Sequence, residues 1–199
     1  MKRAPVSAET IALAADALRE GGIVAYPTET VYGLAVNPFS EAALRRLMNA
    51  KGRPESNPIL CIIAGPEQLD ALVANVSPEA RRCIEKFWPG PLSLVLPKAP
   101  GVPDLLTAGS GRVCVRCPDH DTARALCTAF GGPITSTSAN RSGKPPVSSL
   151  DDLALEGIAL ALDAGPLPPS PPSTVYDPYS GEVLREGAIE AAELAGNTD

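Results

Sequence analysis

Hydroxyl, carboxylate and cationic side chains gather in one stretch of the sequence, residues 26–58. The apolar segment 22–26 predicts a buried strand, and Thr28, Glu29 and Thr30 follow it almost directly. Such a strand would deliver two hydroxyls and a carboxylate to its carboxyl end, where open α/β sheets bind ligands. Alternate residues would share one face if the chain stayed extended: Tyr26, Thr28, Thr30 and Tyr32.

Two cations stand one residue apart in the second part of this stretch. Lys51 and Arg53 lie between glycine and proline, in a loop expected just after a helix over 40–50. Both could be aimed at a single anionic group, and phosphate is the obvious candidate. The alternative is an ordinary solvated surface pair, which is common for lysine and arginine. The sequence contains no glycine-rich phosphate loop that would decide between the two.

Length and composition favour a globular protein. The chain has 199 residues and 44% hydrophobic content, which is enough for one domain with a sizeable core. A net charge of −6 argues against broad, non-specific nucleic-acid binding but leaves room for a local basic cavity. We find neither a signal-peptide pattern nor a run of 18 apolar residues, so we expect a soluble, cytoplasmic protein that is not bound to a membrane.

Apolar strands and amphipathic helices alternate along the chain, which predicts an α/β fold. Helices are expected over 7–20, 40–50, 66–73, 77–87 and 121–129, and from 148 onward. Strands are expected over 22–26, 59–63, 92–97, 112–117 and 158–163, with a hairpin over 173–187. We interpret 99–111 as a loop, 166–172 as a stiff proline-rich crossing segment, and the tail from 188 as a short helix with a frayed end.

Further polar groups follow other predicted strands. Arg116 ends one strand, Arg185 lies in the last hairpin, and residues 133–143 hold a dense cluster of hydroxyls and amides. Such a donor-rich wall suits a phosphate, a carboxylate or a nucleotide base, although turn residues often satisfy only their own backbone. The sequence has no Ser-His-Asp order, no HExxH and no Walker motif. It therefore predicts a site that holds anions and favours phosphoryl or nucleotidyl transfer.

Histidine and cysteine leave two further interpretations open. His120 could act as an acid or base, or it could be a loop or capping residue. Cys114, Cys117, His120 and Cys127 have a spacing that could pass for a zinc site, but positions 114 and 117 of a strand would face opposite ways. The chain has five cysteines, which is an odd number, and no secretion signal; both features favour reduced thiols.

Six segments together resemble the YrdC/Sua5 family of threonylcarbamoyl-adenylate synthases. They are YPTETVYGL (26–34), KGRP (51–54), FWPGPLS (87–93), RCPDH (116–120), STSAN with SG (136–143) and STV (173–175). The combination of Lys-x-Arg with Ser-x-Asn is the specific part of the resemblance. It implies one YrdC-like domain over 1–199, with a core of about 10–190, built as a twisted mixed β-sheet flanked by helices around a large basic cavity.

The resemblance also implies a reaction. The family combines L-threonine, bicarbonate or CO2, and ATP with Mg2+ into threonylcarbamoyl-AMP and pyrophosphate, which makes it a nucleotidyltransferase. The product would pass to a tRNA threonylcarbamoyl transferase complex that modifies adenosine 37 of tRNA, and weak direct tRNA binding is possible. A threonine carbamate supplies its own nucleophilic oxygen, so no nucleophile from the protein is needed.

Site roles carry over by matching positions. Threonine would be held by Thr28, Thr30, Arg116, Ser136 and Thr174. ATP would be held by Lys51, Arg53, Asn57, Ser138, Asn140 and Arg185. Lys51 and Arg53 are the expected catalytic pair, and we expect their replacement by Ala to reduce turnover strongly while leaving folding intact. Many relatives carry a histidine at the position of Ile62, so that contact to threonine would be missing or replaced; the second domain of longer relatives is also expected to be absent.

Two other functions compete with this interpretation. The same fold could serve as a non-catalytic module that binds RNA or the ribosome, although the acidic pI near 4.9 weakens that alternative. A related carbamoyl-transfer domain used in hydrogenase maturation is the other, but it usually sits in a much longer chain that has zinc-finger and acylphosphatase segments.

Overall fold

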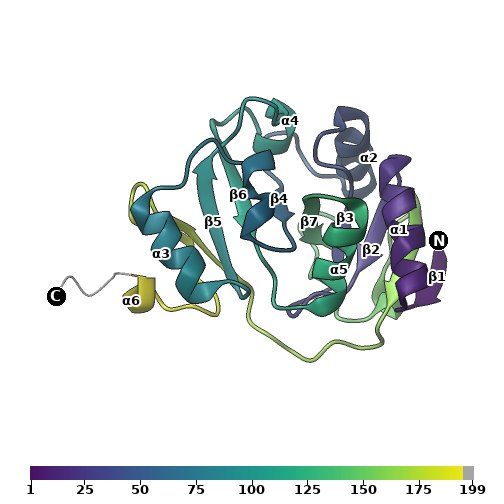
Figure 1. Cartoon of the computed structure of the whole chain (residues 1–199). Helices are drawn as coiled ribbons and strands as arrows, with labels where there is room; N and C mark the ends of the chain where they lie inside the picture. The colour runs from purple at the N-terminus through teal and green to yellow at the C-terminus, as the bar shows by residue number, and fades with distance from the viewer. Residues whose placement is uncertain (195–199) are drawn as a thin grey trace.

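A single ten-stranded mixed sheet runs through the protein (Figure 1). The computed structural model describes residues 1–194. The strand order is β1-β8-β2-β3-β7-β4-β6-β5-β9-β10. The strands are β1 (Lys2–Pro5), β2 (Ile23–Tyr26), β3 (Gly33–Ala35), β4 (Leu60–Ile62), β5 (Leu92–Pro97), β6 (Arg112–Arg116), β7 (Ile134–Ser138), β8 (Ile158–Asp163), β9 (Thr174–Asp177) and β10 (Glu182–Arg185). Parallel and antiparallel pairs both occur, which confirms the predicted α/β class.

Helices connect these strands at the positions that their caps predict. Ser7 caps α1 in a capping box with Thr10, Ser40 caps α2, and Ser77 caps α3 with proline in its first turn. The helices are α1 (Ala8–Arg19), α2 (Glu41–Lys51), α3 (Pro78–Phe87), α4 (Asp104–Thr107), α5 (Asp121–Phe130) and α6 (Ala191–Leu194), with 3-10 turns η1 (Pro66–Ala71) and η2 (Leu150–Asp152). Within the described chain, none of them is long and apolar enough to cross a membrane.

The two faces of the sheet pack against different helices. In β2, Val24 and Tyr26 join the apolar cluster formed with α1 and α5, whereas Ile23 and Ala25 join the cluster formed with α2, α3 and α4. Figure 1 shows α1 and α5 side by side over the half of the sheet that holds β1, β2 and β3. The same face of the other half carries no helix from this pair, and the cavity described below lies there.

Several boundaries differ from the sequence-based expectation. Lys51 is the last residue of α2 and not a loop residue, because Gly52 adopts a left-handed φ of 60° and ends the helix one residue later than predicted. The expected loop over 99–111 contains α4, and the helices expected over 66–73 and from 148 are only 3-10 turns. The end of the expected tail lies outside the described residues.

Residues 26–32 do not stay extended, so the prediction of one shared face is wrong. β2 ends at Tyr26, and the Thr28 hydroxyl accepts hydrogen bonds from the backbone N–H groups of Thr30 and Val31 at 3.2 Å each. This side-chain turn reverses the chain into β3. As a result Tyr26 and Tyr32, both fully buried, pack in different apolar clusters.

Candidate functional site

A cavity of about 560 Å³ lies over one face of the sheet. Alternate residues of adjacent strands form its floor, because side chains of a strand point to opposite faces in turn. On β5 and β6 these are Ser93, Val95, Cys114 and Arg116. The remaining lining residues come mainly from β4, β7, β9, β10 and the loops: Thr28, Thr30, Val31, Gly33, Arg53, Pro58, Leu60, Ser136, Thr137, Ser138, Pro146, Ser170, Pro172, Ser173, Val175, Leu184 and Arg185.

The site therefore occupies a sheet face rather than the carboxyl edge that the sequence suggested. Ser93 and Val95 sit inside β5, and Cys114 sits in the middle of β6. Only Arg116, at the end of β6, and the turn after β2 match the expected strand-end position. The edge rule applies to doubly wound parallel sheets. It fails here because the pairs around β7 and β5 are largely antiparallel, so neighbouring strands end on opposite edges.

The turn after β2 brings two of the predicted threonines to the cavity. Thr28 and Thr30 are 3% and 9% exposed, and their hydroxyl oxygens lie 3.0 Å apart. The Thr28 hydroxyl also donates to the Val31 carbonyl at 2.6 Å. Thr28 is thus committed to holding the turn, while the Thr30 hydroxyl has fewer partners and is the freer of the two to meet a ligand.

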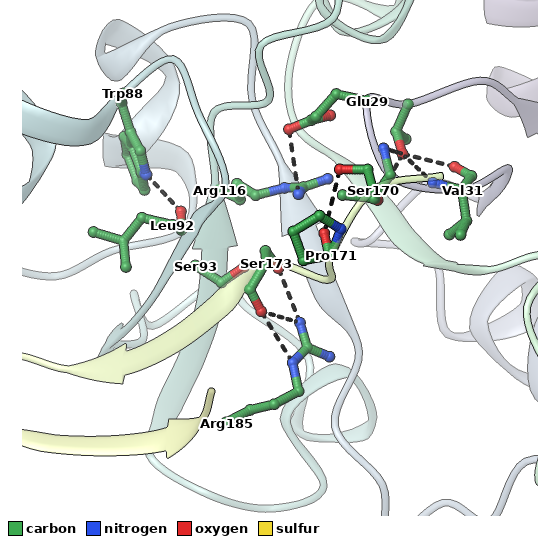
Figure 2. A network of polar contacts seen from close by, with 12 residues as sticks. Glu29, Val31, Trp88, Leu92, Ser93, Arg116, Ser170, Pro171, Ser173 and Arg185 are labelled. Carbon is green, nitrogen blue, oxygen red and sulfur yellow. Dashed lines mark hydrogen bonds and ion pairs between the residues drawn. The ribbon is translucent and has the colours of Figure 1, made fainter. Parts of the chain in front are cut away.

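Arg116 supplies a buried cation at the cavity wall. Its residue is 3% exposed, and its Nη1 lies 3.3 Å from Oε1 of Glu29 (Figure 2). The Nε atom of Arg116 is buried and, within residues 1–194, has no hydrogen-bond partner. An arginine with free N–H groups beside hydroxyls suits a carboxylate, which the guanidinium can bind through two parallel bonds.

Arg53 and Arg185 add two more cations that are held by neutral groups. Arg53 donates to the carbonyls of Asn57 and Pro58, at 3.3 and 2.6 Å. Arg185 donates to the carbonyl and hydroxyl of Ser173 at 2.8 to 3.1 Å, as Figure 2 shows. Burial lowers the pKa of both guanidinium groups. Both stay charged, since an arginine keeps its proton in proteins.

Ser93 and Ser173 are cavity residues that sequence reasoning did not assign. Both are nearly or fully buried, and their hydroxyl oxygens lie 2.9 Å apart. They join β5 to the proline-rich segment that ends at Pro172, and Arg185 fixes the same serine from the other side. The strand alternation of β5 and β9 was the signal that could have found them.

Lys51 lies behind the cavity wall and does not line it. Its residue is 2% exposed, and its Nζ donates to the Asn140 carbonyl at 2.7 Å and to the Ser138 carbonyl. Burial, and to a smaller extent the neighbouring Arg53 cation, lowers the pKa of Lys51 from 10.5 to about 8. Lys51 therefore ties the end of α2 to the end of β7, and it positions the backbone next to Ser138.

The other predicted residues divide between the cavity and its surroundings. Ser136 and Ser138 line it. Thr174 does not: it is fully buried, and its hydroxyl donates to the Ile189 carbonyl at 2.7 Å, because β9 turns Ser173 and Val175 toward the cavity instead. Asn57 is exposed outside the lining, and the Asn140 amide donates to the Arg141 carbonyl at 2.9 Å.

His120 and the cysteines are not arranged for the chemistry that was considered for them. His120 precedes α5 outside the cavity lining, its Nδ1 is buried without a hydrogen-bond partner in the described chain, and burial lowers its pKa. Cys114 faces the cavity, but burial raises the pKa of its thiol to about 12. Between residues 1 and 194 no group of three or more His, Cys, Asp and Glu side chains is placed to hold a metal.

The chain is similar to proteins of a known family. The family model described as Telomere recombination, which covers Sua5, YciO and YrdC, matches residues 16–187. The chain belongs to this family. The matched range contains the cavity-lining residues of the turn after β2, of the sheet and of β10.

Curated relatives of two lengths are similar to the chain. A threonylcarbamoyl-AMP synthase of Pyrococcus abyssi is 42% identical over 189 residues, which is 92% of this chain but 56% of the relative. A threonylcarbamoyl-AMP synthase of Chromohalobacter salexigens is 40% identical over 181 residues, covering 90% of this chain and 98% of the relative. The chain thus spans little more than half of the longer relative and almost the whole of the shorter one.

A solved family structure has the same fold. The crystal structure of P. abyssi Sua5 complexed with L-threonine superposes with a TM-score of 0.89 at 40% identity, covering 98% of this chain and 60% of that chain. This confirms the predicted YrdC-like fold. Ile62, the position at which the resemblance implies a histidine in many relatives, is fully buried in the apolar cluster under α1 and α5 and does not line the cavity.

Proposed function

We propose that the chain is an L-threonylcarbamoyladenylate synthase, a nucleotidyltransferase that uses L-threonine, bicarbonate or CO2, and ATP. The observation that carries the proposal is that Arg116 and the hydroxyls of Thr28 and Thr30 line the same cavity as Arg53 and Arg185, which provide further positive charge. A relative of this name that is 40% identical over 98% of its own length supports the assignment.

The reaction then needs little more from the protein than binding and charge. The ammonium of threonine first releases a proton to solvent, the free amine adds to the carbon of CO2, and a second proton passes to solvent, which gives a carbamate. A carbamate oxygen attacks the α-phosphorus of ATP, the bond to the bridging oxygen breaks, and pyrophosphate leaves. Arg116, with Thr30 and Ser136, would hold threonine; Arg53, Ser138 and Arg185 would hold the phosphates and neutralise charge that develops on them.

In this proposal Lys51 is a positioning residue, because its ammonium donates hydrogen bonds to the Ser138 and Asn140 carbonyls. Thr28 would act by fixing the turn that carries Thr30. We treat Mg2+ as part of the MgATP substrate, where it bridges phosphate oxygens, and we assign no protein ligand to it. The product would be consumed by a tRNA-modifying transferase, so we expect the reaction to take place in the cytoplasm.

Release of pyrophosphate tests the proposal. Purified protein is incubated with MgATP, bicarbonate and L-threonine, and pyrophosphate is followed by a coupled assay together with mass detection of threonylcarbamoyl-AMP. We expect release that depends on both threonine and bicarbonate, and a decrease of about 100-fold in Arg53→Ala, because a lost charge at a phosphoryl centre costs about 3 kcal/mol. Pyrophosphate that appears equally without threonine would contradict the proposal.

Arg185→Lys should raise the KM for ATP by about tenfold while the KM for threonine changes little. A lysine has one nitrogen and cannot reproduce the three contacts that the guanidinium makes to Ser173, so the segment 170–173 loses its anchor at the cavity. Initial rates with ATP varied at saturating threonine measure the effect. An unchanged KM for ATP would show that this side chain does not shape the nucleotide end of the site.

A further inference from the structure

The three arginines of the cavity differ in what balances their charge. Arg53 and Arg185 donate to carbonyl and hydroxyl oxygens, which carry no net charge, and neither forms an ion pair within residues 1–194. Arg116 instead faces the carboxylate of Glu29 across 3.3 Å. The residues that line the cavity include no Asp or Glu, and Glu29 itself is not among them; within the described chain it is the carboxylate that forms an ion pair with a lining residue, Arg116.

The carboxylate of Glu29 is buried and accepts no hydrogen bond in the described chain, so its charge acts on its surroundings. Its side chain is 19% exposed, and neither carboxylate oxygen has a hydrogen-bond partner in the portion of the chain that the structure describes. The contact to Arg116 is an ion pair without hydrogen-bond geometry. Because its oxygens are buried, water screens this carboxylate only weakly, and it acts on charges several ångströms away.

The cavity arginines consequently have different electrical surroundings. Beside Arg116 a cation and an anion nearly cancel, so the local field favours a ligand that itself carries both charges. Arg53 and Arg185 have no carboxylate partner within residues 1–194, and their uncompensated charge favours an anion such as a polyphosphate. An α-amino acid carries its ammonium and carboxylate on one carbon, which matches the surroundings of Arg116 but not those of the other two arginines.

We propose that Glu29 is a specificity-determining residue that makes the part of the cavity around Arg116 select an amino acid over a simple carboxylate or a phosphate. This rests on the proposed function, in which Arg116 holds the carboxylate of threonine. Glu29 acts there in two ways: it attracts the ammonium group, and it offsets the attraction of Arg116 for anions that lack one. The phosphates of the nucleotide are thereby left to Arg53 and Arg185, the two arginines without a carboxylate partner in the described chain.

Two ligands that differ only by the amino group separate this role from a purely structural one. L-threonine and (R)-3-hydroxybutyrate share the carboxylate, the hydroxyl and the methyl group. Binding of each is measured by calorimetry, without ATP, to the wild type, to Glu29→Gln and to Glu85→Gln. Glu85 is exposed on α3 outside the cavity lining, so its variant removes the same charge far from the proposed contact.

We expect opposite shifts in Glu29→Gln: the Kd for L-threonine rises by about tenfold, and the Kd for (R)-3-hydroxybutyrate falls severalfold. Glu85→Gln should match the wild type for both ligands. Weakening of both ligands would mean that Glu29 only holds the shape of the wall, and it would overturn the inference, as would unchanged threonine binding. A wild type that binds no threonine would instead overturn the proposed function itself, and the inference with it.

Discussion

Arg116→Ala is expected to abolish threonine-dependent pyrophosphate release and to lower the free energy of unfolding by about 3 kcal/mol. Activity is lost because the variant removes the guanidinium that is proposed to bind the carboxylate of threonine. Stability is lost for a different reason: the Glu29 carboxylate stays buried without the only cation that it contacts in the described chain. Urea unfolding followed by circular dichroism measures the stability, and the pyrophosphate assay measures the activity.

The double variant Arg116→Ala/Glu29→Gln separates the two effects. Without the carboxylate no buried charge is left alone, so most of the lost stability should return, whereas activity should not. A double variant that is as unstable as Arg116→Ala would mean that the arginine stabilises through its packing rather than through its charge. Recovery of activity would contradict the role of Arg116 in binding threonine.

Most of the larger elements could be predicted from the sequence because their signals are local. Serine caps and glycine ends set the bounds of α1 and α2, and continuous apolar runs set β5 and β8. Strand β7 was not found, because four of its five residues are Ser or Thr and were interpreted only as a hydroxyl cluster. The short strands β1 and β3 were not found either. Their three or four residues carry little pattern, and they form only because β8, β2 and β7 lie beside them in the folded chain.

The types of residue at the site were easier to predict than the directions in which their side chains point. The matched segment around 173–175 points to β9 but does not say which of its residues faces the ligand. A shift of one position exchanges Thr174 for Ser173. Lys51 shows the same limit: its charge suggests a phosphate contact, but only the fold reveals the two carbonyls that its ammonium binds. Glu29 carried no signal beyond its position between two threonines, since its role depends on a partner far along the chain.

Lys51→Met is expected to reduce turnover by about 100-fold and, contrary to the expectation from sequence, to destabilise the fold by about 2 kcal/mol at pH 7. Methionine fills a similar volume but leaves the carbonyls of Ser138 and Asn140 without their donor. The backbone that presents Ser138 to the cavity then loses its position. A Lys51→Met protein with wild-type stability and low turnover would show that the lysine touches the substrate instead.

The pH dependence of stability tests the same group independently. Because the folded-state pKa of Lys51 is about 8 and its ordinary value is 10.5, the unfolded chain holds more protons at this site between those two values. The free energy of unfolding of the wild type, taken relative to Lys51→Met, should therefore rise from pH 8 to pH 10.5 and stay level below pH 8. Denaturant curves of both proteins across this range measure the difference, in which the titration of all other groups cancels. A difference that falls over the same range would mean that the two carbonyls hold the proton on Lys51 more strongly than burial removes it.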